Sequence, residues 1–115
     1  MITLKLEENT VSVVILGEFT LADYKEFEEA VLYGIQFKGP LNLLFDLRDM
    51  VDFTVDVAWE EIKFSREHRF DFRKIAIVAD SQWVAWSSWV QRLFTDADIQ
   101  LFEDYELAHN WVTLN

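Results

Sequence analysis

Two short, almost wholly apolar segments limit the folds open to this chain more than any other feature. Residues 41–47 (LNLLFDL) and 74–79 (KIAIVA) are too short to span a membrane and too apolar for strands with one face in water. Such segments are typical of parallel strands whose two faces are both covered. Helix-like spacing separates them, and an alternation of strands and helices predicts an α/β domain.

The N-terminal part predicts an antiparallel hairpin followed by a helix. Residues 2–7 alternate apolar and polar side chains, and residues 11–16 are rich in β-branched residues, so both read as strands that end at Gly17. Thr20, with Asp23 three positions on, is typical of a helix N-cap. Apolar residues then recur at helical spacing, at Tyr24, Phe27, Val31 and Ile35.

The remaining elements continue the alternation. We expect a loop over 48–53, helices over 56–69 and 81–94, a short strand over 99–102, and a last helix from Asp104 to about residue 112. The expected order is β-β-α-β-α-β-α-β-α, which gives one domain over residues 1–115 with a mixed sheet of about five strands and the hairpin at its edge.

Charge and composition exclude several classes of function. The net charge is −11, from 21 acidic and 10 basic residues, and such a field repels nucleic-acid phosphates and anionic lipid head groups. The chain has no cysteine, so disulfides and zinc–thiolate sites are excluded. Residues 1–6 do not resemble a signal peptide, and no run of about 18 apolar residues occurs. The cytoplasm is the expected compartment, with peripheral membrane contact left open.

Catalytic signals are weak. His68 and His109 lie on different predicted helices without metal-ligand spacing, and we expect both to be exposed or helix-capping. No serine lies in a Gly-x-Ser-x-Gly elbow, and three glycines are too few for a phosphate-binding loop. Asp46, Asp49 and Asp52 follow a strand and could hold a divalent cation, but a solvated acidic loop is favoured. We therefore expect no enzyme activity, no metal site and no cofactor.

The third predicted helix is unusually rich in tryptophan. At about 100° per residue, its bulky side chains fall within an arc of roughly 140°. An ordinary amphipathic helix packed on the sheet explains this pattern and is favoured, but three tryptophans form a large face for a short sheet. The alternative is a site for an apolar ligand, a membrane or a second subunit, formed by Trp83, Trp86, Trp89, Val90, Leu93 and Phe94 with Trp111 of the last helix.

Basic residues gather near the second predicted helix. Five of the ten Lys and Arg residues lie within residues 63–74. Pairing with nearby glutamates and with the helix dipole explains this clustering and is the favoured interpretation. The alternative is a small patch for an anionic head group, made of Lys63, Arg66 and Arg69.

Several segments resemble the SpoIIAA-like family of small bacterial proteins, which is related in fold to STAS and CRAL-TRIO domains. They are LLFDL at 43–47, WEEIKF at 59–64, HRFDFRKIAIVAD at 68–80, and the residues Trp83, Ala108 and Trp111. The resemblance covers essentially the whole chain. It implies a STAS-like α/β domain without established catalytic activity, in which the two C-terminal helices move to open an apolar groove.

One departure from the wider class bears on function. STAS-type anti-sigma-factor antagonists carry a phosphorylatable serine in Asp-x-Ser-Gly after a strand, whereas this chain reads DLRD at 46–49. The departure argues against a phosphoserine switch. The sequence therefore predicts a non-enzymatic module that forms a homodimer and binds an apolar or lipid-like ligand or a membrane surface. The alternative is a STAS-type protein-interaction module without the serine.

Overall fold

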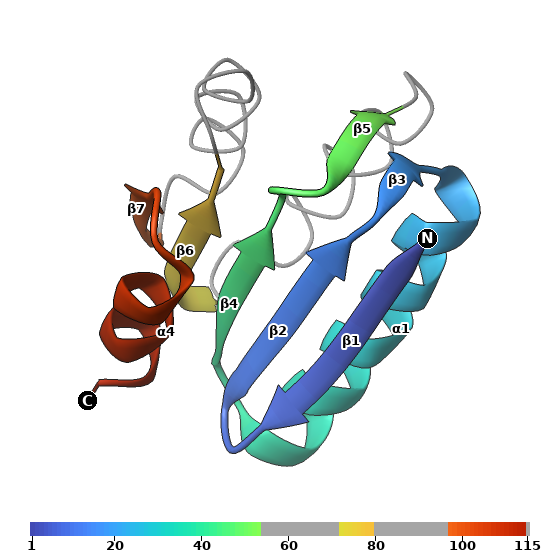
Figure 1. Ribbon diagram of the computed structural model, residues 1–115. Coiled ribbons are helices and arrows are strands. Elements are labelled where there is room, and N and C mark those ends of the chain that lie inside the picture. The colour runs from blue at the N-terminus through green and yellow to red at the C-terminus, as the bar shows by residue number, and fades with distance from the viewer. Residues whose placement is uncertain (54–71, 80–96, 115) are drawn as a thin grey trace.

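The computed structural model describes residues 1–53, 72–79 and 97–114. Its main sheet has five strands in the order β1-β2-β4-β6-β7 (Figure 1). β1 and β2 are antiparallel, and every later pair is parallel. The strands are β1 (Ile2–Glu7), β2 (Thr10–Ile15), β4 (Leu41–Asp46), β6 (Phe72–Val78) and β7 (Asp98–Phe102). The expected five-stranded mixed sheet with an antiparallel hairpin at its edge is confirmed.

Two described helices cover opposite faces of this sheet. Helix α1 (Leu21–Lys38) packs on β1, β2 and β4, and α4 (Tyr105–Thr113) packs on β4, β6 and β7. Figure 1 shows α1 behind the hairpin and α4 in front of the other half. The helices expected over 56–69 and 81–94 lie outside the described residues, so the full predicted order of elements stays a prediction.

Alternate side chains of the strands supply two separate cores, as a period of two requires. Leu43 and Phe45 of β4 pack toward α1, beside the buried Phe27 of that helix. Leu44, on the opposite face, packs with Ala108 and Val112 of α4. All six residues of β4 are buried, which confirms that both faces of this strand are covered.

The predicted loop over 48–53 was wrong in part. Met50–Phe53 forms strand β5, which pairs in parallel with β3 (Gly17–Phe19) in a second, two-stranded sheet. Gly17 therefore begins a strand as well as ending the hairpin, and its φ of 69° suits a residue without a Cβ atom. Segments of three and four residues are too short to show a period, and their pairing depends on the tertiary fold.

Local signals placed both described helices correctly. Thr20 caps α1: its hydroxyl accepts from the Asp23 amide at 3.2 Å, and the Asp23 carboxylate accepts from the Thr20 amide at 3.1 Å. Asp104 caps α4 by accepting from the amide of Glu106 at 2.8 Å. Each cap satisfies amide groups that the first turn of a helix leaves without partners.

Replacing Asp23 with asparagine is expected to reduce the dependence of stability on acid pH. Burial raises the pKa of Asp23, but hydrogen bonds from Thr20 and the Met1 amine outweigh it, so the pKa lies below its ordinary value of 3.8. The ionised carboxylate thus stabilises the fold above pH 3.8, and this contribution is lost as pH falls through the lowered pKa.

At pH 7 we expect Asp23→Asn to cost about 1 kcal/mol. Urea unfolding of wild type and variant from pH 7 to pH 2 measures this cost, and the difference between them should shrink at the acid end. Glu26→Gln, at an exposed site on the same helix, is the control. A constant difference at every pH would contradict the assignment.

Candidate functional site

The clearest candidate site lies on the open face of the hairpin, beside α4. On the face of β1 and β2 opposite α1, polar residues stand side by side: Lys5 is level with Ser12, and Glu7 with Thr10. Their apolar neighbours Val11 and Val13 are buried in the core under α1. The same alternation that builds this core therefore presents a row of polar groups to the other side.

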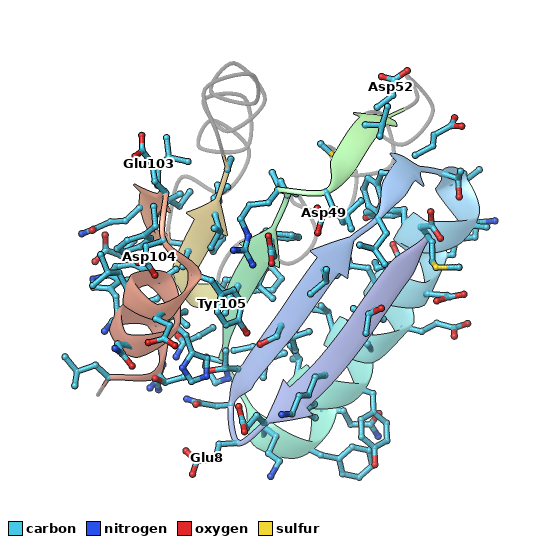
Figure 2. All side chains as sticks on the ribbon, in the orientation of Figure 1. Glu8, Asp49, Asp52, Glu103, Asp104 and Tyr105 are labelled. Carbon is cyan, nitrogen blue, oxygen red and sulfur yellow. The ribbon has the colours of Figure 1, made fainter. Side chains whose placement is uncertain are left out.

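Helix α4 forms the opposite wall. Ala108 and Val112, four residues apart, hold one stripe of the helix against the sheet. Tyr105 and His109, also four residues apart, line the hollow beside the hairpin. Their rings are nearly parallel, at an interplanar angle of 20° and a centroid distance of 6.1 Å. Figure 2 shows Tyr105 at the start of α4, between the helix and the middle of the sheet.

Two neighbouring hollows occupy the space between these walls, and together we call them the hairpin–α4 hollow. The larger, about 280 Å³, is lined by Lys5, Glu7, Ser12, Tyr105, Glu106, His109 and Asn110. The smaller, about 210 Å³, is lined by Glu7, Glu8, Asn9, Thr10, His109 and Thr113. Glu7 and His109 belong to both. Each is smaller than the roughly 300–1,000 Å³ typical of pockets for drug-sized ligands, so each suits a single side chain or small polar group.

Glu7 and His109 link the two walls. Nε2 of His109 lies 3.6 Å from one carboxylate oxygen of Glu7, and Nζ of Lys5 lies 3.7 Å from the other. Both distances exceed those of good hydrogen bonds. The three side chains are partly exposed to water, at 36% for His109, 50% for Glu7 and 70% for Lys5. These contacts are therefore weak enough for a ligand to replace.

Two buried hydroxyl groups line the floor of the hollow. Thr10 is 2% exposed and Ser12 is 9% exposed. Within residues 1–53, 72–79 and 97–114, neither side chain forms a hydrogen bond. Buried polar groups nearly always have a partner, and one without a partner calls for an explanation. Both hydroxyls are available to a bound group.

The acidic residues at the end of β4 and after it differ in their surroundings. Asp46 is 4% exposed and makes two hydrogen bonds to the Arg48 guanidinium, at 2.7 and 2.9 Å. This bond to Asp46 raises the pKa of Arg48 and holds the cation beside the carboxylate. The favoured picture of a solvated acidic loop was wrong for Asp46, because its carboxylate is buried and paired. Among the described residues, no three acidic or histidine side chains are placed to hold a metal.

The residues selected from the sequence as binding sites fall mostly outside the described part of the chain. Trp83, Trp86, Trp89, Val90, Leu93 and Phe94 do so, as do Lys63, Arg66 and Arg69. Trp111 is half-buried, with its ring 5.7 Å from that of Phe102 and the Lys74 ammonium 5.2 Å from its centre. Trp111 thus packs against the core under α4.

The hairpin–α4 hollow was not predicted from the sequence. His109 was expected to be exposed or helix-capping, but it is half-buried against Tyr105 and faces Glu7 of β1. Nothing local in the sequence relates a histidine near the C-terminus to a glutamate in the first strand. The spacing of Tyr105 and His109 on one helix was the only available signal, and many surface helices share it.

Comparisons with known proteins agree on the fold. The sequence model of the SpoIIAA-like family matches residues 10–113. A crystal structure from Shewanella loihica PV-4, of an uncharacterised DUF3478-family protein with a SpoIIAA-like fold, matches with a TM-score of 0.77 and 22% identity, over 97% of this chain and 92% of that one.

The unphosphorylated anti-sigma factor antagonist SpoIIAA matches with a TM-score of 0.65 and 10% identity over the whole of both chains. At these identities the two structures show a shared fold. The search of curated proteins found no match.

Proposed function

The chain belongs to the SpoIIAA-like family, and from this we propose that it is a non-catalytic module that binds another protein. The solved relative SpoIIAA is an anti-sigma factor antagonist and shares the fold. DLRD at 46–49 lacks the serine of the phosphorylated turn, and Arg48 is paired with Asp46. The proposal is therefore a module whose binding is not controlled at that turn.

The observation that carries this proposal is the open polar face of the hairpin. Helix α1 covers the other side of β1 and β2, and α4 covers the far half of the sheet. Lys5 and Glu7 remain exposed between them, at the edge of the hairpin–α4 hollow. A polar, solvent-accessible surface of this kind fits the rim of a protein interface, whereas sites for apolar ligands are mostly apolar.

Cross-linking and reconstitution test the proposal. The full chain is cross-linked in a native extract, the captured protein is produced separately, and the dissociation constant of the purified pair is measured by calorimetry. We expect a complex of defined stoichiometry that weakens as salt rises, because the net charge of −11 favours a basic partner. Failure of every captured protein to bind the purified chain would overturn the proposal.

The second candidate function is binding of an apolar or lipid-like ligand or a membrane surface. The observation in its favour is the tryptophan content of residues 81–94, with Lys63, Arg66 and Arg69 as the head-group patch. No helix in the described ranges is long and apolar enough to cross a membrane. We propose that any membrane contact made through residues 56–69 and 81–94 is peripheral.

Vesicles distinguish this candidate from protein binding. Co-sedimentation with phosphatidylcholine vesicles, with and without phosphatidylglycerol, and displacement of a fluorescent fatty acid are the measurements. Trp86→Ala is expected to reduce binding, and Lys63→Gln to reduce only the part that needs the anionic lipid. No binding to either vesicle and no displacement would remove the candidate. The expected homodimer stays a proposal, and sedimentation of the purified chain tests it.

A further inference from the structure

We propose that the hairpin–α4 hollow binds the guanidinium group of an arginine on the protein partner. This inference rests on the proposed function as a protein-interaction module and names the chemistry that the module recognises. Three features of the hollow carry it: excess negative charge, a pair of stacked rings, and two buried hydroxyls that have no hydrogen-bond partner among the described residues.

The charge around the hollow favours a cation. Among the described residues, three glutamates line it, Glu7, Glu8 and Glu106, against one lysine, Lys5. Figure 2 shows Glu8 at the hairpin turn, where its φ of 55° lies in the left-handed region that glycine and asparagine usually occupy. An anionic group would meet repulsion from all three glutamates.

The rings favour a planar cation over a compact one. Tyr105 and His109 stand nearly parallel and both line the larger hollow. A guanidinium stacks on aromatic rings, and an ammonium lacks the flat surface to do so. Tyr105 already has a guanidinium beside its ring, because Cζ of Arg48 lies 5.5 Å from the ring centre. His109, which lines both hollows, offers the second ring to an incoming arginine.

The hydroxyls favour a ligand with several donors. Thr10 and Ser12 are buried in the floor, and across the described ranges their side chains have no hydrogen-bond partner. Each hydroxyl has lone pairs that accept, and a guanidinium has five N–H donors in a fixed plane. One arginine head can therefore pair with Glu7 and still donate to a hydroxyl below it. An apolar group would leave these hydroxyls unpaired.

Three matched peptides test the inference on the full chain. They are eight-residue glycine–serine peptides that carry three arginines, three lysines or three citrullines, titrated by calorimetry and NMR at low salt. We expect the arginine peptide to bind about fivefold more tightly than the lysine peptide, because only arginine stacks and pairs in one plane. Citrulline keeps the shape without the charge and should not bind measurably. Resonances of Tyr105 and His109 should shift during the titration.

Charge-matched variants locate the site. The double variant Glu7→Gln with Glu106→Gln should weaken the arginine peptide by about fivefold to tenfold, as two partly exposed ion pairs allow. Glu26→Gln with Glu29→Gln removes the same charge from exposed positions of α1, on the other side of the sheet. This control should bind like the wild type. Equal weakening by both double variants would show a general charge effect and overturn the inference.

The variant Ser12→Ala distinguishes a role of the hydroxyl in binding from a role in stability. Loss of an unpartnered hydroxyl should leave the melting temperature unchanged or slightly raised, while the arginine peptide binds about threefold more weakly. Unchanged peptide affinity in this variant would contradict the role of the hydroxyl. If the purified partner binds Glu7→Gln with Glu106→Gln as tightly as wild type, the inference fails and the proposed function stands. If no protein binds the chain, both fail.

Discussion

Replacing Phe27 with alanine is expected to destabilise the domain by about 3–5 kcal/mol, as large-to-small changes of buried aromatic residues do. The ring is 2% exposed, and it lies 5.5 Å from the ring of Phe45 and 6.0 Å from that of Tyr24. It joins α1 to the central strand β4, so the cavity would open between two elements that cannot easily close on it. A loss of this size is a large part of the stability of a typical domain.

Urea unfolding followed by circular dichroism measures the effect. The midpoint should fall while the slope stays unchanged, because the native fold is kept. Phe37→Ala is the matched control on the same helix. Phe37 is 63% exposed and touches Tyr33, so its loss should cost less than about 1 kcal/mol. Equal losses for both variants would contradict the assignment of Phe27 to the core.

Asn42→Ala is expected to cost about 2–4 kcal/mol, because it removes the partners of two backbone groups at once. Nδ2 of Asn42 donates to the carbonyl of Val112 at 2.9 Å, and Oδ1 accepts from the amide of Lys74 at 3.2 Å. The register between β4 and β6 shifts at this point, between Leu41 and Leu43. The side chain therefore supplies a bond that the strand ladder lacks there, and it also holds the end of α4.

Two measurements separate these roles. Unfolding by urea gives the total cost, and amide hydrogen exchange should show faster opening of α4 than of α1 in the variant. Ser12→Ala is the control for loss of a buried polar group, since Ser12 has no hydrogen-bond partner among residues 1–53, 72–79 and 97–114. Its cost should stay within about 0.5 kcal/mol. A similarly small cost for Asn42→Ala would show that neither bond matters.

The contacts of Asn42 also bear on the candidate site. Helix α4 carries Tyr105 and His109, and Asn42 and Lys74 hold its C-terminal end to the sheet: the Lys74 ammonium donates to the carbonyls of Trp111 at 3.3 Å and Leu114 at 2.8 Å. A wall held in this way keeps the two rings in place before a ligand arrives, which lowers the entropic cost of binding. Asn42→Ala should thus weaken the arginine peptide as well, whereas Phe37→Ala should not.

Local patterns in the sequence were sufficient to predict the strands of the main sheet and the two described helices. Period-two alternation marked the hairpin, the apolar run over 41–47 marked a strand covered on both faces, and Thr20 and Asp104 marked the starts of two helices. These signals are readable because strand alternation and helix capping each depend on neighbours within a few residues. The family resemblance came from the same short segments, and the match over residues 10–113 confirms it.

Only the tertiary structure decided what depends on residues far apart in the chain. Pairing of β3 with β5 joins two segments too short to carry a period of their own. The Asp46 carboxylate is buried and paired with the exposed Arg48 instead of being solvated. The hairpin–α4 hollow brings Glu7 of the first strand to His109 of the last helix. Sequence alone therefore determined the strands of the main sheet and the two described helices. Folding decided the pairing of β3 with β5 and which polar side chains meet, because residues distant in sequence become neighbours only when the strands take their order in the fold.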